Sequence, residues 1–599
     1  MPPMPPPGAR AMDWKRYALV GIATFGFYLW ICRPLIAAYY PTTDEIAIEA
    51  ASTPIGGPIH PSSWFTQGFE DYFHPYAEWE SRPSNFFRPL FNAVFWAYYQ
   101  VFGTHWAYQL VFGYLVHALA VCLSAYLAIA VFGLTKPAAS LSILIAALNP
   151  ACWSLYPDTF AIPPVVQFPA YQTEIICGAL VLAAFMAFIR RRFALFALVT
   201  MLALFMKETA LTIPIAALAL PGVWTAAERS RSVRNFLWLA LPLAAWLLIK
   251  LSVFEYGFSS FVMTSTKPLS WLTQPIRNTL LWPTGLYTSA LGQTKSALQM
   301  HQWNIVSVHA LELAINTAWW AAIALAVLCA IRRYGRRWLV AAPAPWVAGL
   351  VFAGSNLALL VALQESHLRY GYLWFALGPA PIFGVLSRRR GGIAMSAALG
   401  LGLALPQLYS IRNALSADSV RNYTRVKEAA RQLTSLLGSL PSTVGTVYLI
   451  DDVAVQIPTP KYMAKFSGYQ GRLLLVNSIR PLPHCAASAQ AAPRYRLTTT
   501  GDMTVLAYSP PMCFEPYFGL PPLALIGPDN RVQRGPWMTY EFPELSVANR
   551  SATAGYGVGQ AWSVSSRDPA CLVKDACAWI GFDEHSGHYY QLDGANRVD

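Results

Sequence analysis

Long apolar segments, separated by short arginine-rich breaks, recur along this chain of 599 residues. Of these residues 55% are hydrophobic and only 12% are charged, whereas a soluble globular chain carries roughly 25% charged residues. This composition excludes an ordinary soluble enzyme. It also excludes a disordered chain, which would be poor in apolar residues. The class that remains is a polytopic membrane protein.

The positive charge of the chain is concentrated in the breaks between apolar segments. Seventeen of the 43 lysines and arginines lie there, opposed only by Asp13 and Glu228. Basic residues gather on the cytoplasmic side of membrane proteins. The net charge of +13 therefore marks one face of a membrane, and no nucleic-acid partner is predicted.

With these breaks as cytoplasmic anchors, the sequence predicts about eleven membrane-spanning helices within residues 17–412. The first apolar run lacks a clear cleavage site, so we expect a retained helix after a cytoplasmic tail of residues 1–16. Exterior loops are expected at about residues 39–105 and 257–309. An odd number of spans places the C-terminus outside. The spans are 17–38, 106–132, 138–153, 172–189, 193–206, 209–223, 235–256, 310–331, 338–363, 370–387 and 393–411.

The tail, residues 413–599, is predicted to be a soluble extracytoplasmic α/β domain. An amphipathic helix over 419–437 leads into the strand-like segments VGTVYLI, GRLLLV and MTVLAY. Four of the nine cysteines lie in the tail, and an even number in an exported domain predicts two disulfides. Three pairings are possible, and the short spacing favours Cys571 with Cys577. The four cysteines are Cys485, Cys513, Cys571 and Cys577.

Lys207 and Glu208 interrupt two apolar runs of 14 residues each, 193–206 and 209–222. Each run would reach about 21 Å as a helix, whereas the hydrocarbon core is about 30 Å thick. The hairpin tip should therefore lie below the exterior surface, inside the protein. Adjacent helical residues point in different directions, so we expect the two side chains to reach different partners. A functional role is favoured over a purely structural ion pair.

Further polar residues are expected on the exterior side. Asp44 and Glu45 directly follow the first span and are either a solvated loop or a general base aimed at an acceptor hydroxyl. Arg88 and Arg369 suit a phosphate or a lipid headgroup, and with Lys207 they predict an anion site. The expected substrate cavity is lined by Glu208, His74, Glu174, Glu365, His367 and Tyr370.

Motifs for nucleotides and metals are missing from the sequence. There is no GxxxxGK[ST] and no GxGxxG between a strand and a helix, which disfavours a cytosolic ATP-driven pump. The histidines show no zinc spacing with thiols. We therefore expect no cofactor. A divalent metal is possible, but we expect activity not to depend on it.

Four segments together resemble the GT-C superfamily of polyprenyl-phosphate-sugar glycosyltransferases. They are Asp44-Glu45, FFRPLFNAVFWAYYQVFGTHWAYQLVFGYLVHAL, LALFMKETALTIP and ESHLRYGYLWF. The chain is most similar to the protein O-mannosyltransferase-like and lipid A aminoarabinose transferase-like members, over about residues 17–390. The RPL element and the helix after it are the most specific part of this resemblance.

The resemblance implies a GT-C fold, a lipid-linked donor such as an undecaprenyl-phosphate sugar, and an exterior active site. Asp44 would be the catalytic base with Glu45 beside it, and Arg88, Lys207 and Arg369 would hold the donor phosphate. A single displacement would move one sugar to an acceptor hydroxyl of a protein, lipopolysaccharide or glycan, with inversion. A lipid-linked glycan transporter or flippase, and a ligase that moves a whole glycan, remain alternatives.

The frequencies of Ala, Arg and Pro suggest a GC-rich genome. The expected location is therefore a bacterial inner membrane, with the tail in the periplasm, and the endoplasmic reticulum is the alternative.

Overall fold

The computed structural model describes the chain in part. The described residues are 14–39, 88–103, 105–152, 172–219, 229–253, single positions between 314 and 332, 344–362, 371–387, 392–415, 417–449, 467–475, and the strands and adjoining positions of the tail from 479 to 592. They divide into two compact units: the first holds the described residues up to Ala37 and those from 88 to 420, and the second holds Ala38, Tyr39 and the described residues from Arg421 onward. Each unit is described by itself.

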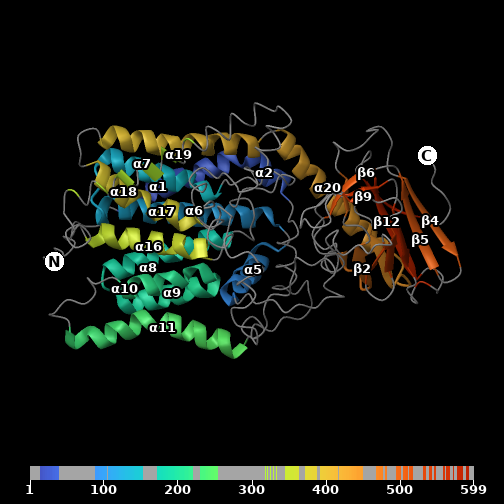
Figure 1. Cartoon of the computed structure of the whole chain (residues 1–599), viewed down its shortest axis with the longest axis horizontal. Helices are drawn as coiled ribbons and strands as arrows, with labels where there is room; N and C mark the ends of the chain where they lie inside the picture. Colours follow the sequence, from blue (N-terminus) through green and yellow to red (C-terminus); the bar gives the residue numbers. More distant parts are fainter. Residues whose placement is uncertain are drawn as a thin grey trace. The chain divides into compact units, whose positions relative to one another are not determined.

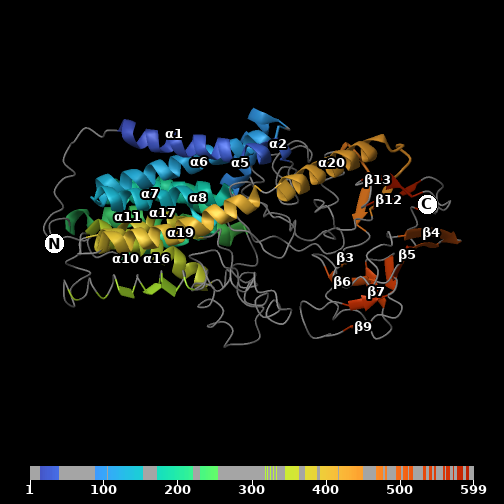
Figure 2. The ribbon, with the colours of Figure 1, turned by 90° about the horizontal axis from the view of Figure 1, so that it is seen from above.

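The first unit is a bundle of α-helices that run side by side (Figures 1 and 2). Its α-helices are α1 (Trp14–Ile31), α2 (Arg33–Ala38), α5 (Pro89–Phe102), α6 (Ala107–Tyr126), α7 (Lys136–Leu148), α8 (Gln172–Ile189), α9 (Phe193–Met206), α10 (Thr212–Ala219), α11 (Arg229–Val253), α16 (Ala344–Ala362), α17 (Tyr372–Leu377), α18 (Pro379–Leu386) and α19 (Gly392–Ala414). Shorter turns are η2 (Leu127–Val131), η3 (Pro150–Cys152) and η6 (Glu208–Leu211).

Three helices within the described residues are long and apolar enough to cross a membrane, namely Ala107–Val131, Gln172–Ile189 and Arg234–Ser252. Shorter apolar helices cover Lys136–Leu148, Phe193–Met206, Glu208–Leu218 and Gly392–Leu405. Each of these overlaps a segment that the sequence predicts to be a span, and four of them begin one or two residues before it. The total of eleven stays a prediction, and most of the span expected at 310–331 lies outside the described residues.

Two predicted spans are broken by proline in the structure. In the span predicted over 138–153, the α-helix already stops at Leu148, because Pro150 disfavours a helical backbone at Asn149. The Asn149 Oδ1 then accepts a hydrogen bond of 3.1 Å from the backbone N–H of Ala151. The span predicted over 370–387 is divided into α17 and α18 at Pro379, which lacks the N–H that would continue the ladder.

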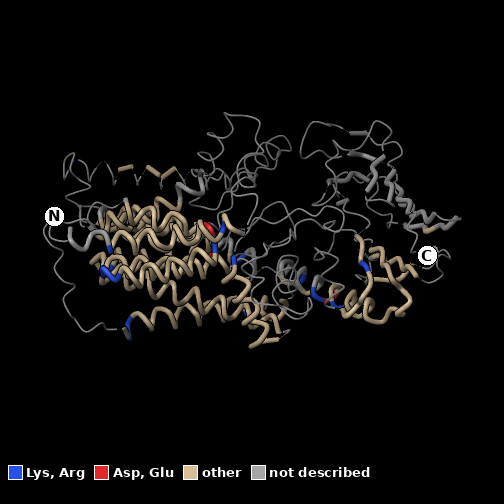
Figure 3. The backbone as a smooth tube through the Cα atoms, turned by 90° about the horizontal axis from the view of Figure 1, so that it is seen from below, with Lys and Arg blue, Asp and Glu red and all other residues tan. Residues whose placement is uncertain are grey.

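Several helix ends of the first unit meet at one end, which we call the basic end. Tyr17 of α1 packs edge-on against Tyr126 at the end of α6, with ring centroids 5.4 Å apart. Arg190, after α8, donates a hydrogen bond to the Tyr126 hydroxyl and lies over its ring. Arg190 belongs to the RRR break that the sequence assigns to the cytoplasm. Other blue segments lie at this end in Figure 3.

Aromatic rings fill the interior of the bundle. Phe185 of α8 is fully buried and lies 5.1 Å from Phe352 of α16 and 6.1 Å from Phe132, between ring centroids. The Trp346 indole N–H donates a hydrogen bond of 2.9 Å to the Phe132 carbonyl. These contacts join α16 to α8 and to the segment after α6, and so fix the helices that carry the polar groups described below.

The second unit contains most of α20 (Ala417–Ser439) and three sheets. The apolar side chains of α20 that are buried recur at helical spacing, Ala429, Ala430, Leu433 and Leu437. One sheet has the order β13-β12-β1-β2, formed by β1 (Thr446–Leu449), β2 (Arg472–Leu475), β12 (Cys577–Asp583) and β13 (His588–Gln591). Strand β1 is parallel to both β2 and β12, whereas β13 is antiparallel to β12.

The other two sheets are antiparallel. The first has the order β3-β6-β10-β9, from β3 (Ile479–Pro481), β6 (Met512–Pro516), β10 (Gly557–Gly559) and β9 (Ser546–Val547). The second has the order β4-β5-β11-β8-β7, from β4 (Arg494–Thr500), β5 (Met503–Ser509), β11 (Trp562–Ser566), β8 (Met538–Glu541) and β7 (Arg531–Arg534). The helix and the three strand-like segments predicted in the tail coincide with α20, β1, β2 and β5.

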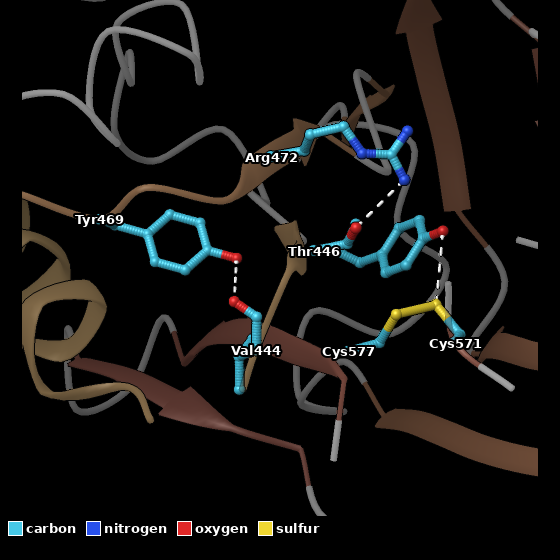
Figure 4. Close-up of a disulfide and its surroundings, with 7 residues drawn as sticks. Val444, Thr446, Tyr469, Arg472, Cys571 and Cys577 are labelled. Atoms are coloured by element: carbon cyan, nitrogen blue, oxygen red, sulfur yellow. Dashed lines mark hydrogen bonds between the residues drawn. A yellow bond between two sulfur atoms is a disulfide. The ribbon is translucent and has the colours of Figure 1, made fainter. Parts of the chain in front are cut away.

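A disulfide joins Cys571 to Cys577, the pair that the sequence favours (Figure 4). The Tyr448 hydroxyl lies 3.8 Å from Cys571 Sγ, and the Tyr448 ring stacks on Trp579. Cys577 begins β12, so this bridge holds the start of a central strand. Cys485 lies outside the described residues, and Cys513 lies on β6.

Polar side chains also fix the start of β1. Arg472 Nη2 donates a hydrogen bond of 3.1 Å to Thr446 Oγ1, and the Tyr469 hydroxyl donates one of 3.0 Å to the Val444 carbonyl (Figure 4). Burial raises the pKa of Tyr469 to about 12, so this hydroxyl keeps its proton at any physiological pH.

Candidate functional site

Two ion pairs lie at one end of the helical bundle. Arg88, just before α5, donates hydrogen bonds from Nε and Nη2 to Glu208 Oε2 at 3.0 and 2.8 Å. Lys207 Nζ donates a hydrogen bond to Glu174 Oε1 in the first turn of α8. Thus three segments far apart in the sequence are joined at this end, which we call the carboxylate end.

The backbone at the tip of the α9 hairpin separates the two pairs. Helix α9 ends at Met206, and Lys207 adopts an extended conformation with φ −161° and ψ 142°. Glu208 then begins the turn η6. Because the helix stops between these residues, their side chains diverge, Lys207 toward α8 and Glu208 toward the start of α5. The prediction that they reach different partners is confirmed.

Both pairs lie opposite the basic end; the Lys207–Glu174 pair is buried, whereas the side chains of Arg88 and Glu208 are 14% and 15% exposed. Glu174 and Lys207 are each 5% exposed. Helix α8 begins beside Lys207 and finishes near Arg190, so the two ends are separated by the full length of α8. Figure 3 shows acidic and basic segments together at one end of the bundle. Buried charges of this kind are costly in a membrane and usually serve a function.

A third cation joins the carboxylate end. Lys250 of α11 is 3% exposed, interacts electrostatically with Glu208, and has its Nζ 5.0 Å from the centroid of the Trp246 ring. Glu208 Oε1 is buried without a hydrogen-bond partner among the described residues. Among the described residues of this end, three cations lie with two carboxylates, an excess of one basic side chain. This arrangement can attract an anion, which would restore neutrality.

A hydrogen-bond network centred on His117 lies next to the pairs. The fully buried His117 has Nε2 3.0 Å from the Ala147 carbonyl oxygen and Nδ1 2.8 Å from the Tyr372 hydroxyl. A carbonyl only accepts, so Nε2 carries a hydrogen, and in a neutral imidazole Nδ1 then accepts the proton of Tyr372. Asn149 Nδ2 donates to the Tyr372 carbonyl at 3.1 Å. Together these contacts hold Tyr372 in one position.

Gln172 links α8 to α5 and α6. Its Oε1 accepts a hydrogen bond of 2.8 Å from the Tyr98 hydroxyl, and its Nε2 donates one of 2.9 Å to the Gln109 carbonyl. Gln172 is two residues before Glu174. The network therefore fixes the turn of α8 that supplies the carboxylate for Lys207.

A small cleft, with enclosed room for about one water-sized group, lies between α8, η6, α16 and α17. It is bounded by the paired carboxylate of Glu174 and by the Tyr372 side chain. Its lining residues are Glu174, Cys177, Gly178, Val181, Thr209, Ala210, Asn356, Tyr372 and Leu373. The described part of the chain therefore places a cleft beside the ion pairs.

Four of the predicted site residues come together at the carboxylate end, namely Arg88, Lys207, Glu208 and Glu174. The others lie outside the described residues, so their expected roles stay predictions: Asp44, Glu45, His74, Glu365, His367, Tyr370 and Arg369.

Sequence reasoning did not select four residues that the structure adds here, His117, Lys250, Asn356 and Tyr372. Lys250 and Asn356 carried a usable signal, because each is a polar residue within an apolar segment. His117 and Tyr372 lie within the segments that carry the resemblance, but nothing in their spacing shows that they touch.

Among the described residues, no group of three or more histidines, cysteines, aspartates or glutamates could hold a metal ion. The described carboxylates at the carboxylate end are instead paired with lysine and arginine.

No family model and no curated protein matches the chain. In structure it is similar to ArnT from Cupriavidus metallidurans, solved in the apo state. The alignment covers 77% of this chain and 85% of that chain, with 13% sequence identity and a TM-score of 0.39. A likeness of this strength leaves the family of the chain open.

Proposed function

We propose that the chain is an integral membrane glycosyltransferase of the GT-C type. It moves a single sugar from a polyprenyl-phosphate donor to an acceptor hydroxyl on the exterior face of a bacterial inner membrane. The proposal is supported by the four sequence segments that resemble this superfamily. The carboxylate end would face the exterior, because the basic end carries the residues expected in the cytoplasm.

The observation that carries the proposal is the contact between two of those segments through Arg88 and Glu208. The RPL element and the KE hairpin are separated by 120 residues, yet a two-donor hydrogen bond joins them. Lys207 of the same hairpin is held by Glu174 close by. Cations held in this way need not reorganise when negative charge develops on a leaving phosphate.

In the proposed reaction, the bond between the anomeric carbon and the phosphate oxygen breaks through an oxocarbenium-like state. The bonding electrons leave with the polyprenyl phosphate, beside Arg88 and Lys207. Asp44, with Glu45 next to it, removes the proton of the acceptor hydroxyl as its oxygen attacks the opposite face of the sugar. One displacement inverts the anomeric centre. Arg369 would add a further cation for the phosphate.

The test uses purified full-length protein in lipid with a panel of radiolabelled polyprenyl-phosphate monosaccharides and membrane extract as the acceptor source. We expect release of free polyprenyl phosphate from one donor, with product carrying a single sugar. Asp44→Asn should abolish release while the protein stays folded, and EDTA should leave release intact. Exposed Glu428 of α20 provides a control, since Glu428→Gln should release at the wild-type rate.

Three outcomes would contradict parts of this proposal. Absence of release from every donor would favour a transporter of lipid-linked glycans. A product that carries many residues would indicate a whole-glycan ligase. Full activity of Asp44→Asn would remove the assigned base, and activity restored by manganese after EDTA treatment would make metal essential.

A further inference from the structure

Asn356 of α16 presents a buried oxygen that has no hydrogen-bond partner in the described part of the chain. The residue is 4% exposed and lines the cleft. Its Nδ2 donates a hydrogen bond of 3.3 Å to the Thr209 carbonyl, which fixes the orientation of the amide. If the amide were flipped, Asn356 Oδ1 would face the carbonyl oxygen of Thr209, and two acceptors would meet. An unpaired buried acceptor costs free energy unless a ligand or water satisfies it.

The other polar groups of the cleft are also short of donors. The Glu174 carboxylate accepts from Lys207 through Oε1, and an ionised carboxylate has no proton to give. The hydroxyl proton of Tyr372 is directed to His117 Nδ1. One amide proton of Asn356 is donated to the Thr209 carbonyl, whereas its Oδ1 accepts none. A ligand that pairs with this oxygen must therefore bring the donor.

The charge and the size of the cleft restrict the class of ligand that it can bind. Lys207 compensates the charge of Glu174, so the cleft does not favour an ammonium ion over a neutral donor. Hydroxyl groups are neutral donors. The enclosed space of the cleft has room for about one water-sized group, so a single hydroxyl can enter it and a whole ring cannot. These features suit one hydroxyl group of a sugar whose ring stays at the mouth of the cleft.

We propose that this cleft is a subsite for one hydroxyl group of the sugar, with Asn356 Oδ1 as the acceptor that sets sugar specificity. The inference deepens the proposed function and rests on it for the identity of the ligand as a sugar. The ion pairs at the carboxylate end would hold the phosphate, and Asn356 would select the sugar attached to it.

The first experiment measures binding without turnover. Full-length protein in nanodiscs is mixed with methyl pyranosides of several hexoses and pentoses, and saturation-transfer NMR reports which bind. We expect one glycoside to bind the wild type and to lose its signal in Asn356→Leu. The matched control is Gln407→Leu, which alters a buried amide of α19, a helix that contributes no residue to the cleft. It should keep the signal.

The second experiment separates sugar from phosphate. In Asn356→Leu we expect KM for the sugar-bearing donor to rise roughly 3- to 10-fold, the change that one lost hydrogen bond produces. Inhibition by bare polyprenyl phosphate should stay unchanged, which also shows that the variant is folded. Asn356→Ser, a smaller change, replaces Asn356→Leu if the latter does not fold.

Absence of binding by any glycoside to the wild type would overturn the subsite and indicate that water alone satisfies Asn356. A parallel loss of donor and bare-phosphate affinity would overturn it too, since that loss marks a structural role. The failure of the subsite and the failure of the transferase proposal can be told apart. The transferase proposal fails if no polyprenyl phosphate is released, whereas the subsite is tested separately by glycoside binding.

Discussion

The Lys207–Glu174 pair shows how strongly one buried charge depends on its partner. Glu174→Gln would leave the buried ammonium of Lys207 without its carboxylate. Removing one partner of a buried pair costs about 3–5 kcal/mol, so we expect the free energy of unfolding to fall by that order. Titration with SDS in mixed micelles measures the loss. Glu428→Gln, on the exposed side of α20, should change it by less than about 0.5 kcal/mol.

Equal small losses in both variants would show that Lys207 does not depend on Glu174 for its burial.

The Lys207–Glu174 pair also shows what the sequence could not predict at the scale of residues. The 14-residue runs around Lys207 predict a buried hairpin tip and diverging side chains. They do not name Glu174 or Arg88, because periodicity defines the face of a helix and not the distant segment that packs on it.

At the scale of elements, α8 and α17 approach each other closely at Gly178. A Cβ built on Gly178 would lie 2.3 Å from Cδ1 of Tyr372. Tyr372 cannot withdraw easily, because His117 and Asn149 hold its hydroxyl and its carbonyl. We expect Gly178→Ala to destabilise the protein by about 1–3 kcal/mol through overpacking, measured by thermal unfolding in detergent.

Gly354 of α16 is the matched control for this substitution. A Cβ there meets nothing within 4 Å, so Gly354→Ala should stabilise the helix by about 0.5–1 kcal/mol. If both variants melted alike, the close approach of α8 and α17 would be wrong.

Helix bounds were largely predictable, and α9 occupies the predicted residues 193–206. The early end of α7 is signalled by Pro150, which the prediction of a span over 138–153 did not take into account.

At the scale of the whole molecule, the two ends of the first unit differ in charge: one carries the basic RRR break and the other the ion pairs. The RRR break and the carboxylate end lie at opposite ends of α8. The sequence predicts this from the positive-inside rule, since the excess of basic residues is a property of the whole chain. The cleft was not predictable in the same way. It needs α8, η6, α16 and α17 at once, and no single segment carries that information.

The two ends should therefore face opposite sides of the membrane, which cysteine labelling can test. Arg192, in the RRR break, and His105, between α5 and α6, are both exposed. We expect a membrane-impermeant maleimide to label His105→Cys in intact spheroplasts, and Arg192→Cys only after permeabilisation. The labelling of the wild type is subtracted as background, because Cys122 is partly exposed and Cys485 and Cys513 lie in the predicted exterior tail. Labelling of both variants from the same side would mean that α8 does not cross the membrane, and the exterior site would lose its basis. Reversed labelling would place the carboxylate end in the cytoplasm, where a polyprenyl-phosphate sugar used at the exterior face could not reach it.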